Sequence, residues 1–231
     1  MHKIGLIASK SALTSLFVCG VMSAAAVAAD LSQYRSIQFG TDLPAVAKQI
    51  GISPSEAKAI HRRPALIQEL EWRPQPFGPS SQTESAQYLV FSFYNGALFQ
   101  IAVNYDRYKT AGLTADDFIE ALSTTYGVAE KPAAPGNIAQ GEFGTQGEIV
   151  ARWQDSQYSF DLIRSSYGPT FRLVGVLKRL QSPVQAAITE AKRLDDQEAP
   201  QRDAARIADE KETERARLEK SRLENKPNFR P

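Results

Sequence analysis

The clearest pattern of hydrophobic positions in the chain lies between residues 88 and 106, and it predicts a β-hairpin. Two runs rich in aromatic and β-branched residues flank Asn95-Gly96, a pair that accepts the positive φ angles of a type I′ turn. A two-residue turn would fix the register and place Ser92 opposite Phe99. Because an isolated hairpin is only marginally stable in water, further strands and helices are expected to pack on it.

Upstream of the hairpin, the hydrophobic spacing predicts two helices and a strand. Apolar residues recur every three or four positions over 43–50, and Gly51 is expected to end this first helix. Ser53 is followed by a proline and, three positions on, by a glutamate, which predicts a capping box and a short helix that reaches Ile60. The alternation over 65–73 then predicts a strand.

Downstream of the hairpin, the same kinds of element follow in the same order. A capped amphipathic helix is predicted over 115–126, and a shift of 76 positions (127 minus 51) places its end, Gly127, on Gly51. A second hairpin is predicted over 148–163 and a further strand over 170–178. These regularities predict an α+β fold of two degenerate helix-plus-antiparallel-sheet repeats, followed by a charged C-terminal helix.

Two segments lack a pattern that would bury them. The glycines of segment 136–147, in a stretch rich in Pro and Ala, predict a flexible loop. From Ser182 a narrow apolar stripe predicts a helix, but after Pro200 charged residues dominate, with opposite charges four positions apart. The tail after Pro200 is therefore expected to be a solvated helix of coiled-coil type or a partly disordered segment.

The first 29 residues have the pattern of a secretory signal peptide, with Lys3 and Lys10 around the start of an apolar region that ends in small residues. An uncleaved membrane anchor is the alternative, because the apolar region nearly reaches the length that crosses a bilayer. We therefore expect a periplasmic or secreted protein. The expected units are a signal peptide over 1–29, helix-sheet repeats over 30–111 and 112–181, and a charged tail over 182–231.

Signal cleavage would leave a chain with few reactive side chains or Cys/His metal ligands. From residue 30 onward there is no cysteine and no methionine, and the one histidine is His61. Removal of Lys3 and Lys10 leaves 25 basic side chains (27 minus 2) against 26 acidic ones, a formal net charge of −1. This inventory excludes disulfides and Cys/His metal sites, and the near-neutral charge disfavours binding to nucleic acid. No cofactor is expected.

The element order resembles a known structural family. Phe39-Gly40 leads into an amphipathic helix that ends at Gly51, and a short second helix, antiparallel strands and a second copy follow. This arrangement, over residues 37–178, resembles the α/β module of the β-lactamase-inhibitor-protein-like and SmpA/OmlA-like (outer-membrane assembly lipoprotein) superfamily. The resemblance implies a small exported, non-catalytic module that binds another protein through an exposed sheet face. It transfers no individual functional residue.

The densest cluster of hydrogen-bond donors is formed by His61, Arg62 and Arg63, at the predicted end of the short helix. The cluster is a candidate contact for an anion or a protein partner, since cations are favoured at a helix C-terminus. The alternative is an exposed basic turn before Pro64. A catalytic role for His61 would require a nucleophile and an orienting acid, and the sequence has no signature of them.

Aromatic residues are the second group of candidates. Trp72, Phe91 and Phe93 either belong to the core, where aromatic side chains dominate packing, or form an exposed apolar patch that binds a partner. Glu69 and Glu71 share one face of a predicted strand, a placement that suits acid/base chemistry but is also common where a strand faces water. The tentative binding residues are Trp72, Phe91, Phe93, His61, Arg62 and Arg63.

These patterns contain no catalytic constellation, so the protein is expected not to be an enzyme. The leading hypothesis is an exported interaction module that binds another exported or envelope protein through a sheet face and adjoining loops. The alternative is a periplasmic carrier of a small apolar ligand, held in a pocket between the sheet and the helices. A hydrolase, the third hypothesis, would need His61 or paired carboxylates in a cleft. No membrane span is expected after signal cleavage, and no particular oligomeric state is favoured.

Overall fold

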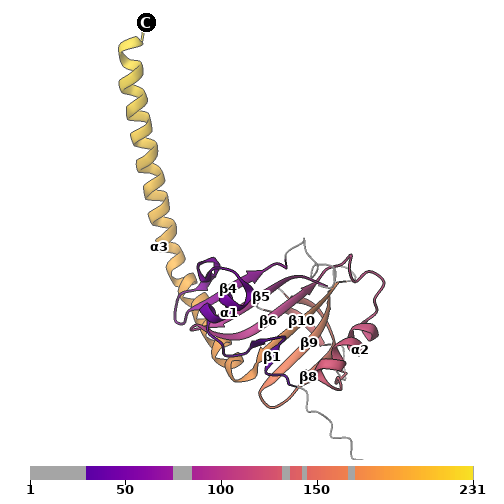
Figure 1. Cartoon of the computed structure of the whole chain (residues 1–231). Helices are drawn as coiled ribbons and strands as arrows, with labels where there is room; N and C mark the ends of the chain where they lie inside the picture. Colours follow the sequence, from indigo (N-terminus) through magenta and orange to yellow (C-terminus); the bar gives the residue numbers. More distant parts are fainter. Residues whose placement is uncertain (1–29, 75–84, 132–135, 142–144, 166–169, 231) are drawn as a thin grey trace, which may run out of the picture.

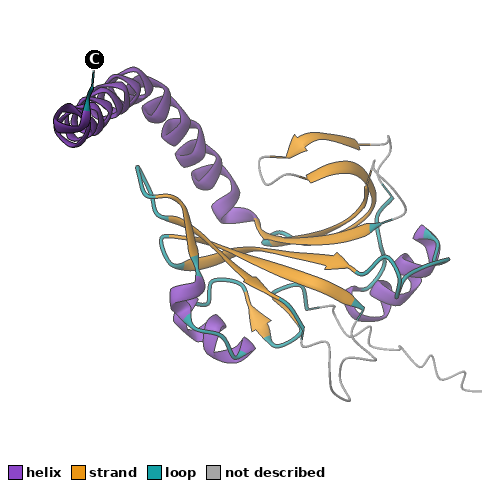
Figure 2. Cartoon of the chain, turned by 90° about the horizontal axis from the view of Figure 1, so that it is seen from above, coloured by secondary structure: helices purple, strands orange, loops and turns teal. Residues whose placement is uncertain are grey.

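The structure, a computed structural model, describes residues 30–74, 85–131, 136–141, 145–165 and 170–230 (Figure 1). A large antiparallel sheet carries two short helices on one face, and one long helix leaves the sheet from the other side (Figure 2). This architecture confirms the predicted α+β class. The signal peptide predicted over 1–29 lies outside the described residues.

The helices are α1 (Leu43–Ile50), α2 (Ala115–Tyr126) and α3 (Lys178–Asn225), with short 3-10 turns η1 (Pro54–Glu56) and η3 (Lys226–Asn228). The large sheet contains β3 (Lys58–His61), β4 (Ile67–Trp72), β5 (Ala86–Tyr94), β6 (Ala97–Tyr105), β7 (Gly136–Gly141), β8 (Thr145–Gln154), β9 (Tyr158–Ser165) and β10 (Phe171–Leu177). Two shorter strands, β1 (Gln33–Tyr34) and β2 (Ile37–Gln38), form a separate sheet.

The large sheet has the strand order β3-β4-β5-β6-β10-β9-β8-β7, and each neighbouring pair is antiparallel. Each half of the sheet is therefore a four-stranded meander that follows one helix in the sequence, α1 or α2. The two halves join where β6 pairs with β10. The repeat hypothesis requires this element order, but it also claims similarity between the halves, and that claim stays a prediction.

Helices α1 and α2 begin and end where their capping residues predict. The Asp42 carboxylate accepts a hydrogen bond from the backbone N–H of Ala45 at 2.8 Å, and Gly51 ends α1 with a φ of 74°. At the start of α2, Thr114 and Asp117 form a capping box. Both helices pack against the same face of the sheet through their apolar side chains (Figure 2).

The main core lies between this face of the sheet and helices α1 and α2. Its fully buried side chains include Leu70, Phe91, Phe93, Leu98, Ile101, Trp153, Phe160, Leu162 and Leu173. The Phe160 ring lies 4.5 Å from that of Tyr126 and 5.9 Å from that of Phe39, measured between ring centroids. Gly175 faces Phe160 across the strand pair, and a Cβ atom added there would lie 2.4 Å from the Phe160 ring. The absence of a side chain at Gly175 thus makes room for the aromatic ring.

The first hairpin has the predicted turn. Asn95 and Gly96 have φ angles of 48° and 85°, the left-handed values that a type I′ turn needs at both central positions. Asn95 also ties this turn to the start of β4. Its Oδ1 atom accepts the backbone N–H of Leu66 at 3.0 Å, and its own N–H donates to the Leu66 carbonyl at 2.8 Å.

The register of this hairpin differs from the predicted one because a β-bulge follows the turn. The bulge sets Ser92 opposite Gln100, and not opposite Phe99 as predicted. Successive side chains of a strand point to opposite faces, so this shift of one residue moves the rest of β6 to the other face relative to β5. As a result Ile101 stands beside Phe91 in the main core.

Two segments form strands where the pattern predicted another structure. The capping box at Ser53 is present, but it starts only the turn η1, and the helix predicted to reach Ile60 is wrong because β3 occupies this position. The predicted loop over 136–147 is also wrong, since β7 and the start of β8 lie there. In both places pairing with a neighbouring strand satisfies backbone groups that a short helix or a loop would leave to water.

Helix α3 has a base that packs on the sheet. It begins at Lys178, directly after β10, so the predicted start at Ser182 is four residues late (182 minus 178), and Pro183 lies inside the helix. The buried residues of the base are Val184, Ala187, Ile188 and Ala191. Val184, Ala187 and Ile188 pack against Ile67 and Phe99 on the face of the sheet opposite the main core. The base therefore belongs to the folded body of the protein.

Beyond Pro200, α3 leaves the sheet and runs outward (Figure 1). In this distal arm, residues 201–225, every side chain is exposed except that of Ser221, which is half-buried. At about 1.5 Å per residue the arm is roughly 38 Å long. Of the two predicted alternatives for the tail, the structure shows the solvated helix. No helix in the described ranges has both the length and the apolar character that crossing a lipid bilayer requires.

Candidate functional site

On the face of the sheet opposite the main core, the base of α3 is the only described helix that packs, and it covers one end (Figure 2). Next to it, strands β5, β6 and β10 present a mixed set of side chains. Pairing across these strands aligns Tyr88, Asn104 and Arg172 in one row and Val90, Ala102 and Val174 in the next. We call these six residues the open patch.

The open patch is half-buried at most of its positions, while its central residues Ala102 and Asn104 are 6% and 9% exposed. The Nε atom of Arg172 donates a hydrogen bond to Oδ1 of Asn104 at 2.6 Å. The amide nitrogen of Asn104 is buried and has no hydrogen-bond partner in the described part of the chain. Native proteins rarely leave a buried donor unpaired, so the Asn104 amide lacks a hydrogen bond that a buried group would normally make.

Charged groups border the open patch. The guanidinium of Arg73 lies over the Tyr88 ring, 5.0 Å from its centroid. On the other side, Asp161 pairs across strands with Val174 and accepts two hydrogen bonds from Arg152, at 2.6 and 2.8 Å. An apolar strip with a polar and charged rim is the usual anatomy of a protein interface.

Phe91 and Phe93 are not part of an exposed patch. Both side chains are 0% exposed and belong to the main core. The hypothesis that these rings are exposed is therefore wrong, and the alternative that they are core residues is the one the structure supports. The β-bulge is the physical reason, because it brings Ile101 and Val103 to the same face and so creates a continuous apolar surface for α1 and α2 to cover.

Trp72 lies half-buried at the edge of the sheet and lines a cavity of about 590 Å³. Five of the ten residues that line this cavity are charged: Glu56, Lys58, Glu69, Glu71 and Arg73. Sites for apolar ligands are lined mainly by apolar side chains. The cavity beside Trp72 therefore gives no support to the hypothesis of an apolar-ligand carrier.

Glu69 is the acidic residue of this cavity that its surroundings perturb most clearly. Burial raises the pKa of Glu69 above its ordinary value, the negative charge of Glu71 raises it further, and Lys58, its cross-strand neighbour, opposes the shift. Glu71 itself forms an ion pair with Arg73 at 2.7 Å. The ionised Glu69 carboxylate is thus less favourable in the folded chain than in the unfolded one.

We expect Glu69→Gln to raise the denaturant midpoint of the protein at pH 7. A raised pKa means that the folded chain binds the Glu69 proton more tightly, so stability falls as the pH rises past the ordinary value of 4.5 toward the higher folded value. The variant should lose its advantage below pH 4.5, where Glu69 is protonated in both states. Glu71→Gln, at an exposed position, is the matched control and should change the midpoint less. A Glu69→Gln variant that is less stable than wild type at pH 7 would show that attraction to Lys58 prevails.

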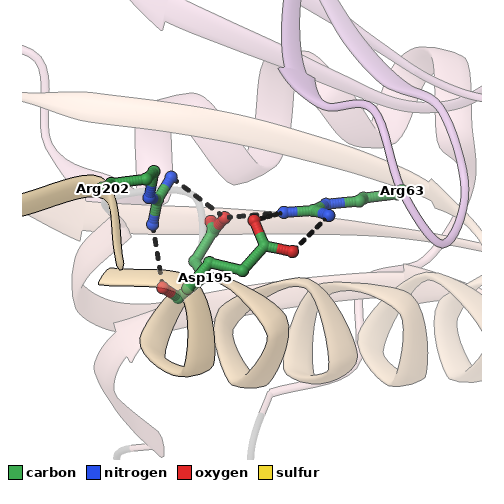
Figure 3. Close-up of polar contacts among 4 residues, drawn as sticks. Arg63, Asp195 and Arg202 are labelled. Carbon is green, nitrogen blue, oxygen red and sulfur yellow. Dashed lines mark hydrogen bonds and ion pairs between the residues drawn. The ribbon is translucent and has the colours of Figure 1, made fainter. Parts of the chain in front are cut away.

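The basic cluster lies beside the base of α3, and one of its members forms an ion pair there (Figure 3). The Arg63 guanidinium donates to both carboxylate oxygens of Glu198, with Nη1 and Oε1 2.6 Å apart. Asp195 lies 3.9 Å from Arg63 and 3.6 Å from Arg202, so that acidic and basic groups alternate. The Arg63 guanidinium lowers the pKa of the Glu198 carboxyl. Arg63 therefore links the β3–β4 connection to α3 through an ion pair at the protein surface.

His61 and Arg62 line a smaller cavity of about 250 Å³ between β3 and α3. His61 ends a strand and not a helix, so the argument that a helix C-terminus favours cations does not apply to it. The described lining includes one acid, Asp195, and no hydroxyl or thiol group. A nucleophilic reaction would need such a group beside the histidine. The hydrolase hypothesis therefore gains no support from this cavity.

Metal binding has no evident site in the part of the chain that the structure describes, where no group of three or more His, Cys, Asp or Glu side chains is placed to hold an ion. The open patch combines apolar side chains, a tyrosine and an arginine on one sheet face.

Sequence reasoning did not single out the residues of the open patch. The hairpin register was predicted without the bulge that sets Val90 opposite Ala102. Val174 and Arg172 lie in a strand whose alternation is clear, but the alternation does not say which face water reaches. Only the pairing of β10 with β6 shows that these residues share one surface.

Comparison with known proteins identified no relative: no protein-family model, no curated protein and no solved structure matches this chain. The family resemblance of its element order stays a prediction.

Proposed function

We propose that this protein is a non-catalytic module that binds another exported or envelope protein through the open patch. One observation carries the proposal: a sheet face that no described helix covers has a row of apolar side chains, with a valine on each side of Ala102. An antiparallel sheet with one solvated face normally places polar side chains on that face. Here Val90, Ala102 and Val174 form an apolar row across three strands.

The other members of the open patch also suit protein recognition. Tyrosine and arginine are among the residue types that contribute most to binding at interfaces. Tyr88 and Arg172 lie in the row beside the valines. The strands at the end of the sheet away from α3 curve toward the side from which α3 leaves (Figure 2). A sheet curved in this way presents its open face to a convex partner.

Export is the second part of the proposal, and it rests on the signal-peptide pattern of residues 1–29. An exported chain that has no cysteine after residue 29 does not depend on disulfides for stability. The expected partner is therefore another protein of the same compartment, bound by side-chain packing and hydrogen bonds.

A photocrosslinking experiment in cells that produce the protein tests this proposal. Tyr88 is replaced by the photoreactive analogue p-benzoylphenylalanine, which keeps an aromatic ring in the open patch. Irradiation is expected to yield a covalent complex of discrete mass. The matched control carries the same analogue at Tyr108, which is 79% exposed and lies outside the patch.

A second substitution shows whether the complex forms through the patch. Val174→Arg adds a long charged side chain two strands from Tyr88, and it should abolish the Tyr88 crosslink while far-UV circular dichroism shows a folded chain. The proposal is wrong if Tyr88 yields no complex, if Tyr108 yields the same complex, or if Val174→Arg leaves the yield unchanged.

A further inference from the structure

The distal arm of α3 carries a narrow seam of residues that the folded body does not use. The seam consists of Ala204, Ile207, Lys211, Glu214, Leu218 and Ser221. These positions are alternately three and four residues apart, the spacing of the a and d positions of a heptad, so they lie along one side of the helix. Ile207 and Leu218 are 44% and 58% exposed, although large apolar side chains gain from burial.

Two charged residues in the middle of the seam determine what can bind to it. Lys211 and Glu214 lie between Ile207 and Leu218, and all four are exposed. Glu214 also pairs with Arg217 of its own helix, 2.8 Å apart. A helix that packs on this seam is favoured when it places an acid against Lys211, a base beside Glu214 and an apolar side chain at each end. The same seam read in the reverse direction has this arrangement.

We propose that two copies of this chain associate through their distal arms as an antiparallel pair of helices. In this pair Ile207 packs against the partner's Leu218. Lys211 lies against the partner's Glu214, and Ala204 against the partner's Ser221. Each contact occurs twice, because a two-fold axis relates the copies. The surface is separate from the open patch, so the inference is independent of the proposed function.

Charges explain the orientation. A parallel pair would place Lys211 against the partner's Lys211 and Glu214 against the partner's Glu214, whereas the antiparallel pair replaces both repulsions by attractions. On one flank of the antiparallel pair, Glu210 also approaches the partner's Arg217. Farther out on this flank, Asp203 approaches the partner's Glu224, an unfavourable contact near the exposed ends of the pair, where screening by solvent is strongest.

The shape of the molecule permits this pairing. The arm runs away from the sheet (Figure 1), and its 25 residues (201 to 225) extend for about 38 Å at 1.5 Å per residue. In an antiparallel pair the two folded bodies lie at opposite ends of the paired arms. The bodies therefore do not compete for the same space.

Charge exchange at the two central positions tests the inference in the full chain. Sedimentation equilibrium is expected to show a reversible monomer–dimer equilibrium for wild type. Lys211→Glu alone places acids against acids and should raise the dimer dissociation constant about tenfold or more, as should Glu214→Lys alone, which places bases against bases. The double variant with both changes restores opposite charges and should associate like wild type. Lys220→Glu, on the outer side of the helix, is the control and should have no effect.

Mixing the two single variants gives the sharpest result. Equimolar Lys211→Glu and Glu214→Lys chains should form a heterodimer, since each supplies the charges that the other lacks. Cysteine variants then report the orientation, because the chain after residue 29 has no cysteine of its own. Ala204→Cys mixed with Ser221→Cys should form the mixed disulfide in preference to either like pair. A wild-type chain that stays monomeric up to its solubility limit overturns the proposal, and so does association that neither single variant weakens.

Discussion

Replacement of Phe91 by alanine is expected to lower the free energy of unfolding by about 3–5 kcal/mol. The Phe91 side chain is 0% exposed, and its removal would leave a cavity in the main core between β5 and the helices. Close-packed interiors collapse only partly around such a cavity, which is why the loss exceeds the transfer free energy of the ring. Chemical denaturation followed by far-UV circular dichroism measures the change.

The matched control for this variant is Phe229→Ala. The Phe229 ring is 74% exposed beyond the end of α3, so its loss should change the stability by less than about 0.5 kcal/mol. The two variants together separate the two hypotheses for Phe91. A Phe91→Ala chain as stable as wild type would contradict its assignment to the core and return the residue to the list of candidate binding residues.

Trp153→Ala should also cost about 3–5 kcal/mol, for a different combination of reasons. Trp153 is 1% exposed, and its indole N–H donates to the carbonyl of Gly127 at 3.0 Å. The same N–H lies 3.3 Å from the hydroxyl of Ser123. Truncation thus removes a large apolar side chain and also the hydrogen bond that holds the C-terminal end of α2 against β8.

Two further variants test this account. Trp153→Phe keeps most of the packing but lacks the indole donor, so it should recover a part of the lost stability. Trp72→Ala is the control, because Trp72 is the other tryptophan and is only half-buried at the sheet edge. Equal losses from Trp153→Ala and Trp72→Ala would show that burial in the main core does not determine the effect.

Helices α1 and α2 could be predicted closely because their boundaries depend on local chemistry. Asp42 and Gly51 delimit α1 through contacts within one turn, and the capping box at Thr114 does the same for α2. The type I′ turn at Asn95 was predictable for the same reason. Each of these signals acts over a few residues, so the sequence carries it without reference to the rest of the fold.

The register of β6 could not be predicted, because the turn and the packing of the core favour different pairings and the bulge accommodates both. The Asn95-Gly96 turn alone favours Ser92 opposite Phe99. The bulge lets Ile101 enter the main core while Phe99 packs against the base of α3 on the other face. That second contact depends on a helix more than 80 residues later in the chain (184 minus 99), and no local pattern reports it.

The candidate surfaces could not be predicted from the sequence for a related reason. The open patch exists only when β5, β6 and β10 lie side by side, an arrangement of strands from both halves of the chain. The charged character of the arm was evident from composition. Its seam could be recognised only once the arm was known to be a continuous helix. His61, Arg62 and Arg63 were noticed because they are adjacent in the sequence. In the structure, Arg63 forms an ion pair with Glu198 of α3.

Because α3 is one continuous helix, its two ends should unfold in different ways. The base stays helical because Val184 and Ile188 are buried, whereas the arm depends on its backbone and on ion pairs such as Arg206 to Glu210, each contributing about 0.2–0.5 kcal/mol. Fraying should therefore advance inward from Asn225 at little cost and stop near Pro200, just outside the Arg63–Glu198 pair. In a lone chain, the arm would therefore unfold separately from the folded body, and a single free energy of unfolding would describe only the part that includes the sheet.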